Sequence, residues 1–166
     1  MSNYATQFGS LANYQKGEIE IINDDPRNFA FSNIFEVASK SAPYEKVVVA
    51  KNLQYVIEAI RAEGTSAWFT ADHDEFVIVM DGSIELDLVK LEDAAAVVPP
   101  GTEGAIAIKG EPKGKKMGLI KLGCGHQALL PRGAAYRFRA PKPACLIQQG
   151  MAGALSIEKW ADICYR

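Results

Sequence analysis

Apolar runs in the middle of the chain predict β-strands. Residues 76–80 form the longest apolar run of the β type, and residues 83–88 alternate between apolar and polar. The pair Asp81-Gly82 between the two runs is typical of a two-residue hairpin turn, because both turn positions need positive φ. We therefore predict an antiparallel hairpin over residues 75–89.

The rest of the pattern indicates short strands separated by turns. Residues 53–61 fit either a helical stripe or a strand face, and we favour a strand because β-branched residues are frequent there. The lysine-rich residues 109–116 contain enough Gly and Pro to indicate a solvated hairpin loop, with an anion site as the alternative. Ser156 is placed to cap a short C-terminal helix.

Further strands are predicted at residues 18–22, 46–50, 104–108, 117–122, 126–130, 135–139 and 144–148, with turns at 99–101, 131–133 and 141–143. Short strands with a turn about every eight to twelve residues are the pattern of an all-β barrel or sandwich.

The first part of the chain differs because it has little regular pattern. We divide the chain into an N-terminal arm, residues 1–44, and a barrel domain, residues 45–166. The arm's large apolar side chains must be buried somewhere, either on the chain's own barrel or on a partner subunit. Two aromatic residues ahead of the apolar run could likewise belong to the core or to an interface. The candidate interface residues are therefore Phe29, Phe31, Phe35, Trp68 and Phe69.

Composition and charge exclude several classes of partner. Hydrophobic residues make up 48% of the 166 residues and the formal net charge is -2, which gives no reason to expect nucleic acid or an anionic membrane surface. No apolar run approaches about 18 residues, so we expect no membrane span, and the start of the chain lacks the pattern of a signal peptide. The three cysteines form no CxxC pair, which indicates reduced thiols in a cytoplasmic protein.

The region after residue 124 resembles the second short motif of the cupin family, whose members are small antiparallel β-barrels. Gly125, Pro131 and Gly133 stand at the motif's glycine and proline places. Tyr136 stands where the motif has a histidine, and Ala140 where it has an asparagine. The resemblance implies a single cupin (jelly-roll) antiparallel β-barrel, here with an N-terminal extension and a short C-terminal helix.

The first cupin motif is matched only in its second half, by Glu75 and Gly82. No register supplies its two histidines, and the chain's only histidines, His73 and His126, stand outside the motif positions. Cupin metal sites use several imidazoles and a carboxylate, a ligand set suited to Fe(II) and Mn(II). The scaffold residues are thus kept while the ligand set is lost.

Four residues are candidates for chemistry, each with a structural alternative. His73 and Glu75, two positions apart, should share a face; they could form part of a relocated metal site or a polar pair at the barrel mouth. His126 could complete such a site, or be a turn or interface residue. Tyr136 could bind an aromatic ligand or act as an acid, or it could fill the barrel with its hydroxyl on a buried carboxylate such as Glu75. We favour the structural role in each case, and expect no catalytic or metal-binding residue on this chain.

Longer runs at residues 31–46, 52–68 and 73–82 resemble the small subunit of two-component hydroquinone 1,2-dioxygenases. In that family a larger cupin-like subunit carries the non-haem Fe(II) and opens the aromatic ring, while the small subunit is metal-free and is required for a stable, active hetero-oligomer. The resemblance implies a non-catalytic subunit without a cofactor of its own, whose partner holds Fe(II) and whose complex binds an aromatic substrate. The alternatives are a stand-alone cupin metalloenzyme with an altered ligand set and a metal-free cupin that binds or isomerises a small molecule.

Overall fold

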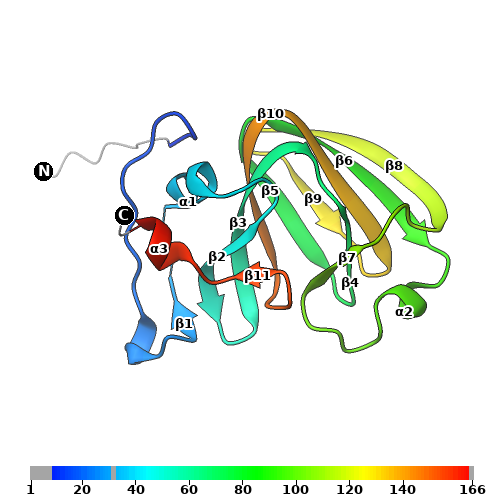
Figure 1. The fold of residues 1–166 in the computed structure, drawn as a ribbon, viewed down its shortest axis with the longest axis horizontal. Coiled ribbons are helices and arrows are strands. Elements are labelled where there is room, and N and C mark those ends of the chain that lie inside the picture. The colour runs from blue at the N-terminus through cyan, green and yellow to red at the C-terminus, as the bar shows by residue number, and fades with distance from the viewer. Residues whose placement is uncertain (1–8, 31–32, 165–166) are drawn as a thin grey trace, which may run out of the picture.

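The structure of the chain is a computed structural model, and it describes residues 9–30 and 33–164. Eleven strands are joined by hydrogen bonds into one sheet that folds into two layers, because β10 (Ala134–Met151) runs through both (Figure 1). The strands of the first layer are, in order, β9 (Gln127–Leu130), β5 (Glu75–Asp81), the C-terminal half of β10, β3 (Tyr55–Thr65) and β2 (Lys46–Asn52), with β1 (Asn28–Phe29) and β11 (Ser156–Ile157) both paired to β2. Those of the second layer are β8 (Gly114–Gly123), β6 (Ser83–Leu91), the N-terminal half of β10, β4 (Trp68–Ala71) and β7 (Ala105–Ile108).

This arrangement confirms the predicted all-β barrel. All the strand pairs are antiparallel except β11 with β2. The main core lies between the two layers and contains Ile60, Leu86, Phe138 and Leu146. The strands predicted near residues 46, 53, 104, 117 and 126 are β2, β3, β7, β8 and β9, with ends that differ by a few residues.

The prediction of a hairpin around Asp81-Gly82 is wrong. β5 pairs with β10 and β9, whereas β6 pairs with β10 and β8, so the turn carries the chain from one layer to the other. Gly82 has a φ of 78°. A Cβ there would lie 2.9 Å from the Cβ of Ala144, so glycine is needed for both the left-handed backbone and the close approach.

β10 also differs from the prediction, which divided it into two strands with a turn at the prolines. It is one strand of 18 residues, and Pro141 and Pro143 lie in it where the pairing with β3 shifts between Ala140 and Ala144. A proline has no N–H to donate to a ladder, so within a sheet it is tolerated at such an irregularity. The prolines therefore mark the bend where β10 passes from one layer to the other.

The loop over the lysine-rich stretch does not join a hairpin. β7 pairs with β4 and β8 pairs with β6, so residues 109–113 connect two strands that are not neighbours. Glycine and proline indicate that the chain turns there, but they carry no information about which strands pair afterwards. Helix α2 (Ala94–Val97) lies in the earlier connection between β6 and β7.

The arm does not form the strand predicted at residues 18–22. Ile21 makes a single bridge to Phe29, and a 3-10 turn, η1 (Ile22–Asp24), follows with Asn23 and Asp24 in the left-handed region. Asn and Asp enter this region more readily than other side chains, so the turn begins inside the alternating stretch. The division at residue 44 stays a prediction.

Two helices cover part of the outer side of the first layer. Asn33 caps α1 (Ile34–Lys40) by accepting hydrogen bonds from the N–H groups of Phe35 (3.0 Å) and Glu36 (3.3 Å). α3 begins at Trp160 (Trp160–Cys164) and not at Ser156, because Ser156 pairs with β2. Both helices lie beside β2 and β3 (Figure 1). In residues 9–30 and 33–164, every helix is too short or too polar to span a membrane.

Candidate functional site

The cupin-motif residues Glu75 and Tyr136 meet inside the barrel. Glu75 is the first residue of β5, Tyr136 lies in the N-terminal half of β10, and both side chains are buried. The Tyr136 hydroxyl donates a hydrogen bond to Oε2 of Glu75 at 2.8 Å. This contact, one of the alternatives predicted for Tyr136, is confirmed. A phenol and a carboxylate therefore bond to each other where the cupin motifs place metal ligands.

The hydrogen bonding continues deeper into the barrel. Nε2 of Gln148 donates to the Tyr136 hydroxyl at 2.9 Å, and Nζ of Lys46 donates to Oε1 of Gln148 at 2.9 Å. Lys46 lies 3.8 Å from Oε2 of Glu58, whose Oε1 accepts from the Ser156 hydroxyl at 2.7 Å. We call this set the interior network; its members are Lys46, Glu58, Glu75, Tyr136 and Gln148.

The sequence analysis missed Lys46, Glu58 and Gln148. Each lies two positions from a buried apolar residue of its own strand, namely Val48, Ile60 and Leu146. Because alternate residues of a strand point to the same face, this spacing was the signal that could have placed the three polar side chains inside.

Lys46 brings a positive charge into the barrel. It is only 3% exposed, and its Nζ lies 5.2 Å from the ring centroid of Phe69 and 5.8 Å from that of Tyr136. A cation near aromatic faces is attracted by their negative charge density. The ammonium group thus lies among two rings, an amide oxygen and a carboxylate.

The network shifts the pKa values of its acidic members. Burial opposes the charge of Glu75, but the hydrogen bond to His73, the charge of Lys46 and the Tyr136 hydroxyl outweigh it and lower the pKa of Glu75. Burial raises the pKa of Glu58, and Lys46 offsets only part of that effect. Burial and then the charge of Glu75 raise the pKa of Tyr136 well above its ordinary value. Tyr136 is therefore a hydrogen-bond donor held in its protonated form.

His73 lies beside Glu75, as predicted, although it stands in the turn before β5. Its Nε2 lies 3.5 Å from Oε1 of Glu75 and 3.3 Å from the N–H of Met151. Nε2 accepts from Met151 only when unprotonated, and pairs with Glu75 only when protonated. The hydrogen bond to Glu75 raises the pKa of His73. This shift favours the protonated imidazole, which pairs with Glu75, over the neutral one, which accepts from Met151.

His126 does not join this pair. It lies exposed in the turn before β9, where its Nδ1 accepts a hydrogen bond from the N–H of Gly123 at 3.2 Å. Within residues 9–30 and 33–164, no group of three or more His, Cys, Asp or Glu side chains is placed to hold a metal ion.

The residues inside the barrel do not fit a divalent ion. No histidine stands at a motif position, and the Lys46 ammonium lies within the same network, where it would repel a second cation. A Cβ on Gly150 would lie 2.5 Å from Oε1 of Glu75, so the backbone of β10 is in contact with the carboxylate. The one motif carboxylate is thus fully engaged by the protein itself.

The predicted interface residues lie in different environments. Phe29, Trp68 and Phe69 are buried within this chain, whereas Phe35 is half-buried on α1. Phe31 lies outside the described residues. An interface role for these five residues stays a prediction, and three of them already have a structural role in the core.

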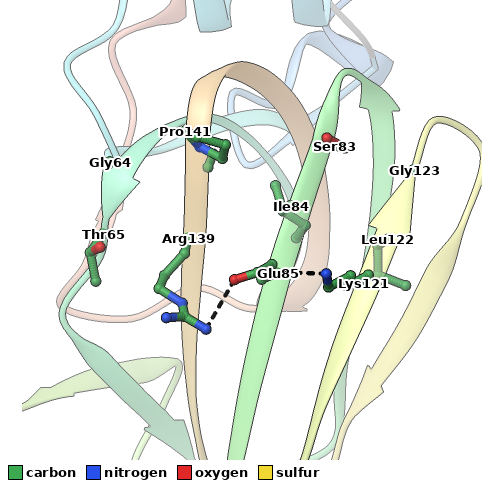
Figure 2. A pocket seen from close by; sticks show the side chains of 11 residues that line it. Gly64, Thr65, Ser83, Ile84, Glu85, Lys121, Leu122, Gly123, Arg139 and Pro141 are labelled. Atoms are coloured by element: carbon green, nitrogen blue, oxygen red, sulfur yellow. Dashed lines mark ion pairs between the residues drawn. The ribbon is translucent and has the colours of Figure 1, made fainter.

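A hollow of about 570 Å³ lies away from the interior network, at one end of the second layer (Figure 2). Its charged residues pair with each other: Glu85 lies 3.0 Å from Nη2 of Arg139 and 3.6 Å from Nζ of Lys121. No member of the interior network lines it. We therefore do not assign the motif chemistry to this hollow.

The barrel and its motif positions define the chain as a cupin. No protein-family model matches it, and no curated protein matches it, but solved structures do. A chain of hydroquinone 1,2-dioxygenase from Sphingomonas sp. TTNP3 with 4-hydroxybenzoate bound is 56% identical, with a TM-score of 0.86 over 98% of both chains. A chain of hydroquinone 1,2-dioxygenase PnpCD in complex with Cd2+ and 4-hydroxybenzonitrile is 53% identical, with a TM-score of 0.83 over 99% of this chain and 100% of that one.

This chain belongs to the hydroquinone 1,2-dioxygenase family, as its sequence resemblance indicated. The membership assigns it a role in that oxygenase. A further match shows the fold alone: another chain of the Sphingomonas sp. TTNP3 enzyme, in complex with 4-nitrophenol, is 12% identical with a TM-score of 0.56. There 89% of this chain matches only 42% of the other.

Proposed function

We propose that this chain is the small, non-catalytic and metal-free subunit of a ring-cleaving hydroquinone 1,2-dioxygenase. A larger cupin-like subunit carries the Fe(II) and binds the aromatic substrate. The observation that carries this proposal is the interior network, in which Tyr136 and Glu75 bond to each other at the motif positions. The cation within that network is the side chain of Lys46, and its buried ammonium group stabilises the two glutamates without a metal ion.

The lengths of the matching chains support a complex of two kinds of subunit. The Sphingomonas sp. TTNP3 enzyme has one chain that this chain covers to 98% and another that it covers to 42%. The second chain is thus about twice as long, since 89% of this chain corresponds to 42% of it. A pair of a short and a long chain, both containing a cupin fold, is what we propose here.

The bound molecules of the similar enzymes indicate the class of substrate. 4-Hydroxybenzoate, 4-hydroxybenzonitrile and 4-nitrophenol are all phenols with a substituent opposite the hydroxyl group. We infer that the complex accepts a ring with oxygen substituents in the same para relationship, as in hydroquinone. We also place the complex in the cytoplasm, where the free thiols of Cys124 and Cys145 would stay reduced.

The role of the subunit would be to stabilise the larger one. A chain that binds only the folded, competent form of its partner shifts the partner's equilibrium toward that form by mass action. The larger chain alone should therefore lose iron and activity faster than the assembled enzyme.

Reconstitution tests the proposal. The two chains are purified separately, and iron content and hydroquinone cleavage are measured for each alone and for the mixture. We expect no cleavage and no bound iron with this chain alone, and activity in the mixture well above that of the larger chain. Stoichiometric metal on the isolated chain that is lost in His73→Ala would favour a stand-alone metalloenzyme. Tight binding of a phenol by the isolated chain would favour a small-molecule-binding cupin.

A further inference from the structure

The outer side of the first layer carries an apolar surface that residues 9–30 and 33–164 leave only partly covered. β5 alternates strictly: Glu75, Val77 and Val79 are buried inside the barrel, and the residues between them point outward and are only partly buried. The residues paired with them across β9, β10 and β3 point the same way. We call this surface the apolar outer face; it consists of Ile57, Phe76, Ile78, Met80, Leu129 and Ile147.

The strand register makes these side chains neighbours. Phe76 pairs with Leu129 on one side and with Gln149 on the other, and Gln149 pairs with Ile57. In the next row, Ile78 pairs with Ile147. The outward side chains of these paired residues are thus either apolar or uncharged amides.

Between its terminal residues Glu75 and Asp81, β5 is therefore apolar on both of its sides. A strand with this composition is normally buried on both faces, whereas a strand with one solvated face alternates apolar with polar residues. In the other layer, β6 and the N-terminal half of β10 follow that rule: their outward residues Glu85, Asp87, Arg137 and Arg139 form ion pairs.

The chain's own helices cover only the neighbouring part of the first layer. α1 and α3 pack on Val47, Val49 and Ala59 of β2 and β3, and Ile57 lies at the edge of that cluster. Leu129, at the other edge on β9, is 58% exposed. Within the part of the chain that the structure describes, the cover by helices thus ends at Ile57, where the apolar outer face begins.

Hollows continue the surface toward the turn between β2 and β3. One of about 450 Å³ is lined by Phe29, Tyr55 and Ile57, and one of about 230 Å³ by Tyr55, Phe76 and His73, among others. Tyr55 is 61% exposed between them. A surface that is both apolar and indented suits a partner with protruding side chains.

We propose that the apolar outer face binds the larger chain, by packing against the outer side of that chain's own cupin layer. This inference rests on the proposed function, because the partner is the subunit proposed there. The larger chain of the similar enzyme contains a region with this fold, so it has a corresponding layer. Two sheets that pack face to face lie about 10 Å apart, with side chains filling the space between them.

The choice of the larger chain over a second copy follows from the same match. The similar enzyme supplies two chains with this fold, and the longer one is only 12% identical to this chain. An interface between such different chains does not require either surface to be complementary to itself. A second copy would require this surface, hollows included, to fit itself about a two-fold axis.

Two exposed leucines on edge strands provide a matched test. Leu129 lies on β9 within the apolar outer face, and Leu119, which is 39% exposed, lies on β8 of the second layer. Each is changed to Glu, and the dissociation constant is measured for the larger hydroquinone 1,2-dioxygenase chain from the same organism. Gln149→Glu adds a charge at an exposed position between Phe76 and Ile57 with little change in shape.

We expect Leu129→Glu to weaken binding by at least roughly 30-fold and Gln149→Glu by about tenfold, because a buried charge at an interface is left unpaired. Leu119→Glu should change the dissociation constant by less than about threefold, since surface residues outside the interface contribute little. All three variants should unfold within about 2 °C of the wild type, because the substituted positions are exposed.

The possible outcomes separate this inference from the proposed function. Equal effects of Leu129→Glu and Leu119→Glu in a pair that does associate would overturn the interface and leave the proposed function intact. No association between the wild-type chains would overturn both. Self-association of this chain alone that Leu129→Glu abolishes, and that the larger chain does not displace, would overturn the choice of partner.

Discussion

The interior of the barrel and the apolar outer face contrast in what they present to their surroundings. The interior holds two glutamates, a lysine, a tyrosine and a glutamine that satisfy one another, whereas the outer side of β5 presents Phe76, Ile78 and Met80.

The contrast has a physical consequence. Polar groups that are fully hydrogen-bonded to one another are unavailable to a substrate or an ion. Apolar groups on the surface become a favourable contribution only when another surface covers them and removes them from water. The proposed function therefore assigns the stability of this chain to its interior and its binding to the larger chain to its exterior. The predictions below probe the interior and use exterior or exposed positions as controls.

Removal of the buried cation should have the largest effect. Lys46→Met leaves Glu58 without its ion-pair partner and removes one of the positive charges near Glu75, so we expect a loss of about 3–5 kcal/mol in the free energy of unfolding. Lys121→Met is the control, because that side chain is 78% exposed beside Glu85, and exposed pairs contribute at most about 1 kcal/mol. Urea unfolding measures both, and similar losses in the two variants would contradict a structural role for Lys46.

A methyl group added beside Glu75 should have the next largest effect. The Cβ of Gly150→Ala would meet Oε1 of Glu75 at 2.5 Å, and overpacking of this kind costs about 1–3 kcal/mol. Gly118→Ala is the matched control in β8, because a Cβ there meets nothing within 4 Å. Thermal unfolding of both variants checks the prediction. An unchanged unfolding midpoint for Gly150→Ala would contradict tight packing of β10 against Glu75.

Loss of a single hydroxyl group sharpens the contrast further. Tyr136→Phe removes the bridge between Glu75 and Gln148, and a buried partner left unsatisfied costs about 1–3 kcal/mol. Tyr55→Phe, on the exposed side, should leave stability unchanged within about 0.5 kcal/mol. In the assembled enzyme, the kcat for hydroquinone should stay within about twofold of wild type for Tyr136→Phe. A large fall in kcat with iron content unchanged would place Tyr136 in catalysis.

The smallest effect concerns pH. His73 has a raised pKa in the folded chain because of its hydrogen bond to Glu75, so its stabilising contribution is full below the ordinary value of 6.5 and is lost as the pH rises through the folded value. The wild-type urea midpoint should therefore decline as the pH increases above 6.5. His73→Gln should remove that part of the decline, and His126→Gln should retain it. Parallel profiles for wild type and His73→Gln would disprove the ion pair.

Glu75 gives the opposite dependence at low pH. Its lowered pKa means that its contribution is present above the ordinary value of 4.5 and is lost as the pH falls through the folded value. Glu75→Gln should therefore reduce the acid sensitivity of the chain, as measured by unfolding below pH 4.5. The wild type and this variant should converge in stability as the pH decreases.

The sequence was sufficient for the positions of most strands but not for their partners. Asp81-Gly82 carries the same local signal whether the flanking strands pair with each other or separate into two layers. The pairing of β5 with β9 and of β6 with β8, together with the approach of Gly82 to Ala144, distinguishes the two cases, and these are contacts between distant parts of the chain. Similarly, Pro141 and Pro143 indicate an interruption, and tertiary pairing determines that β10 continues through it.

The candidate site shows the same division. The contact between Tyr136 and Glu75 could be predicted because both stand at motif positions that converge in the barrel. For Lys46 the two-residue spacing from Val48 indicates the face of the strand but not burial, because a lysine at the start of an apolar strand is usually solvated. Its burial depends on Glu58 and Gln148 arriving from β3 and β10, and no local pattern encodes that convergence.

The location of iron tests the central claim most directly. Native mass spectrometry of the assembled, active enzyme, followed by gentle dissociation, reports the mass of each released chain with its bound metal. We predict that this 18.0 kDa chain is released without metal and that iron stays with the larger chain. Release of the 18.0 kDa chain with one iron bound would contradict the account.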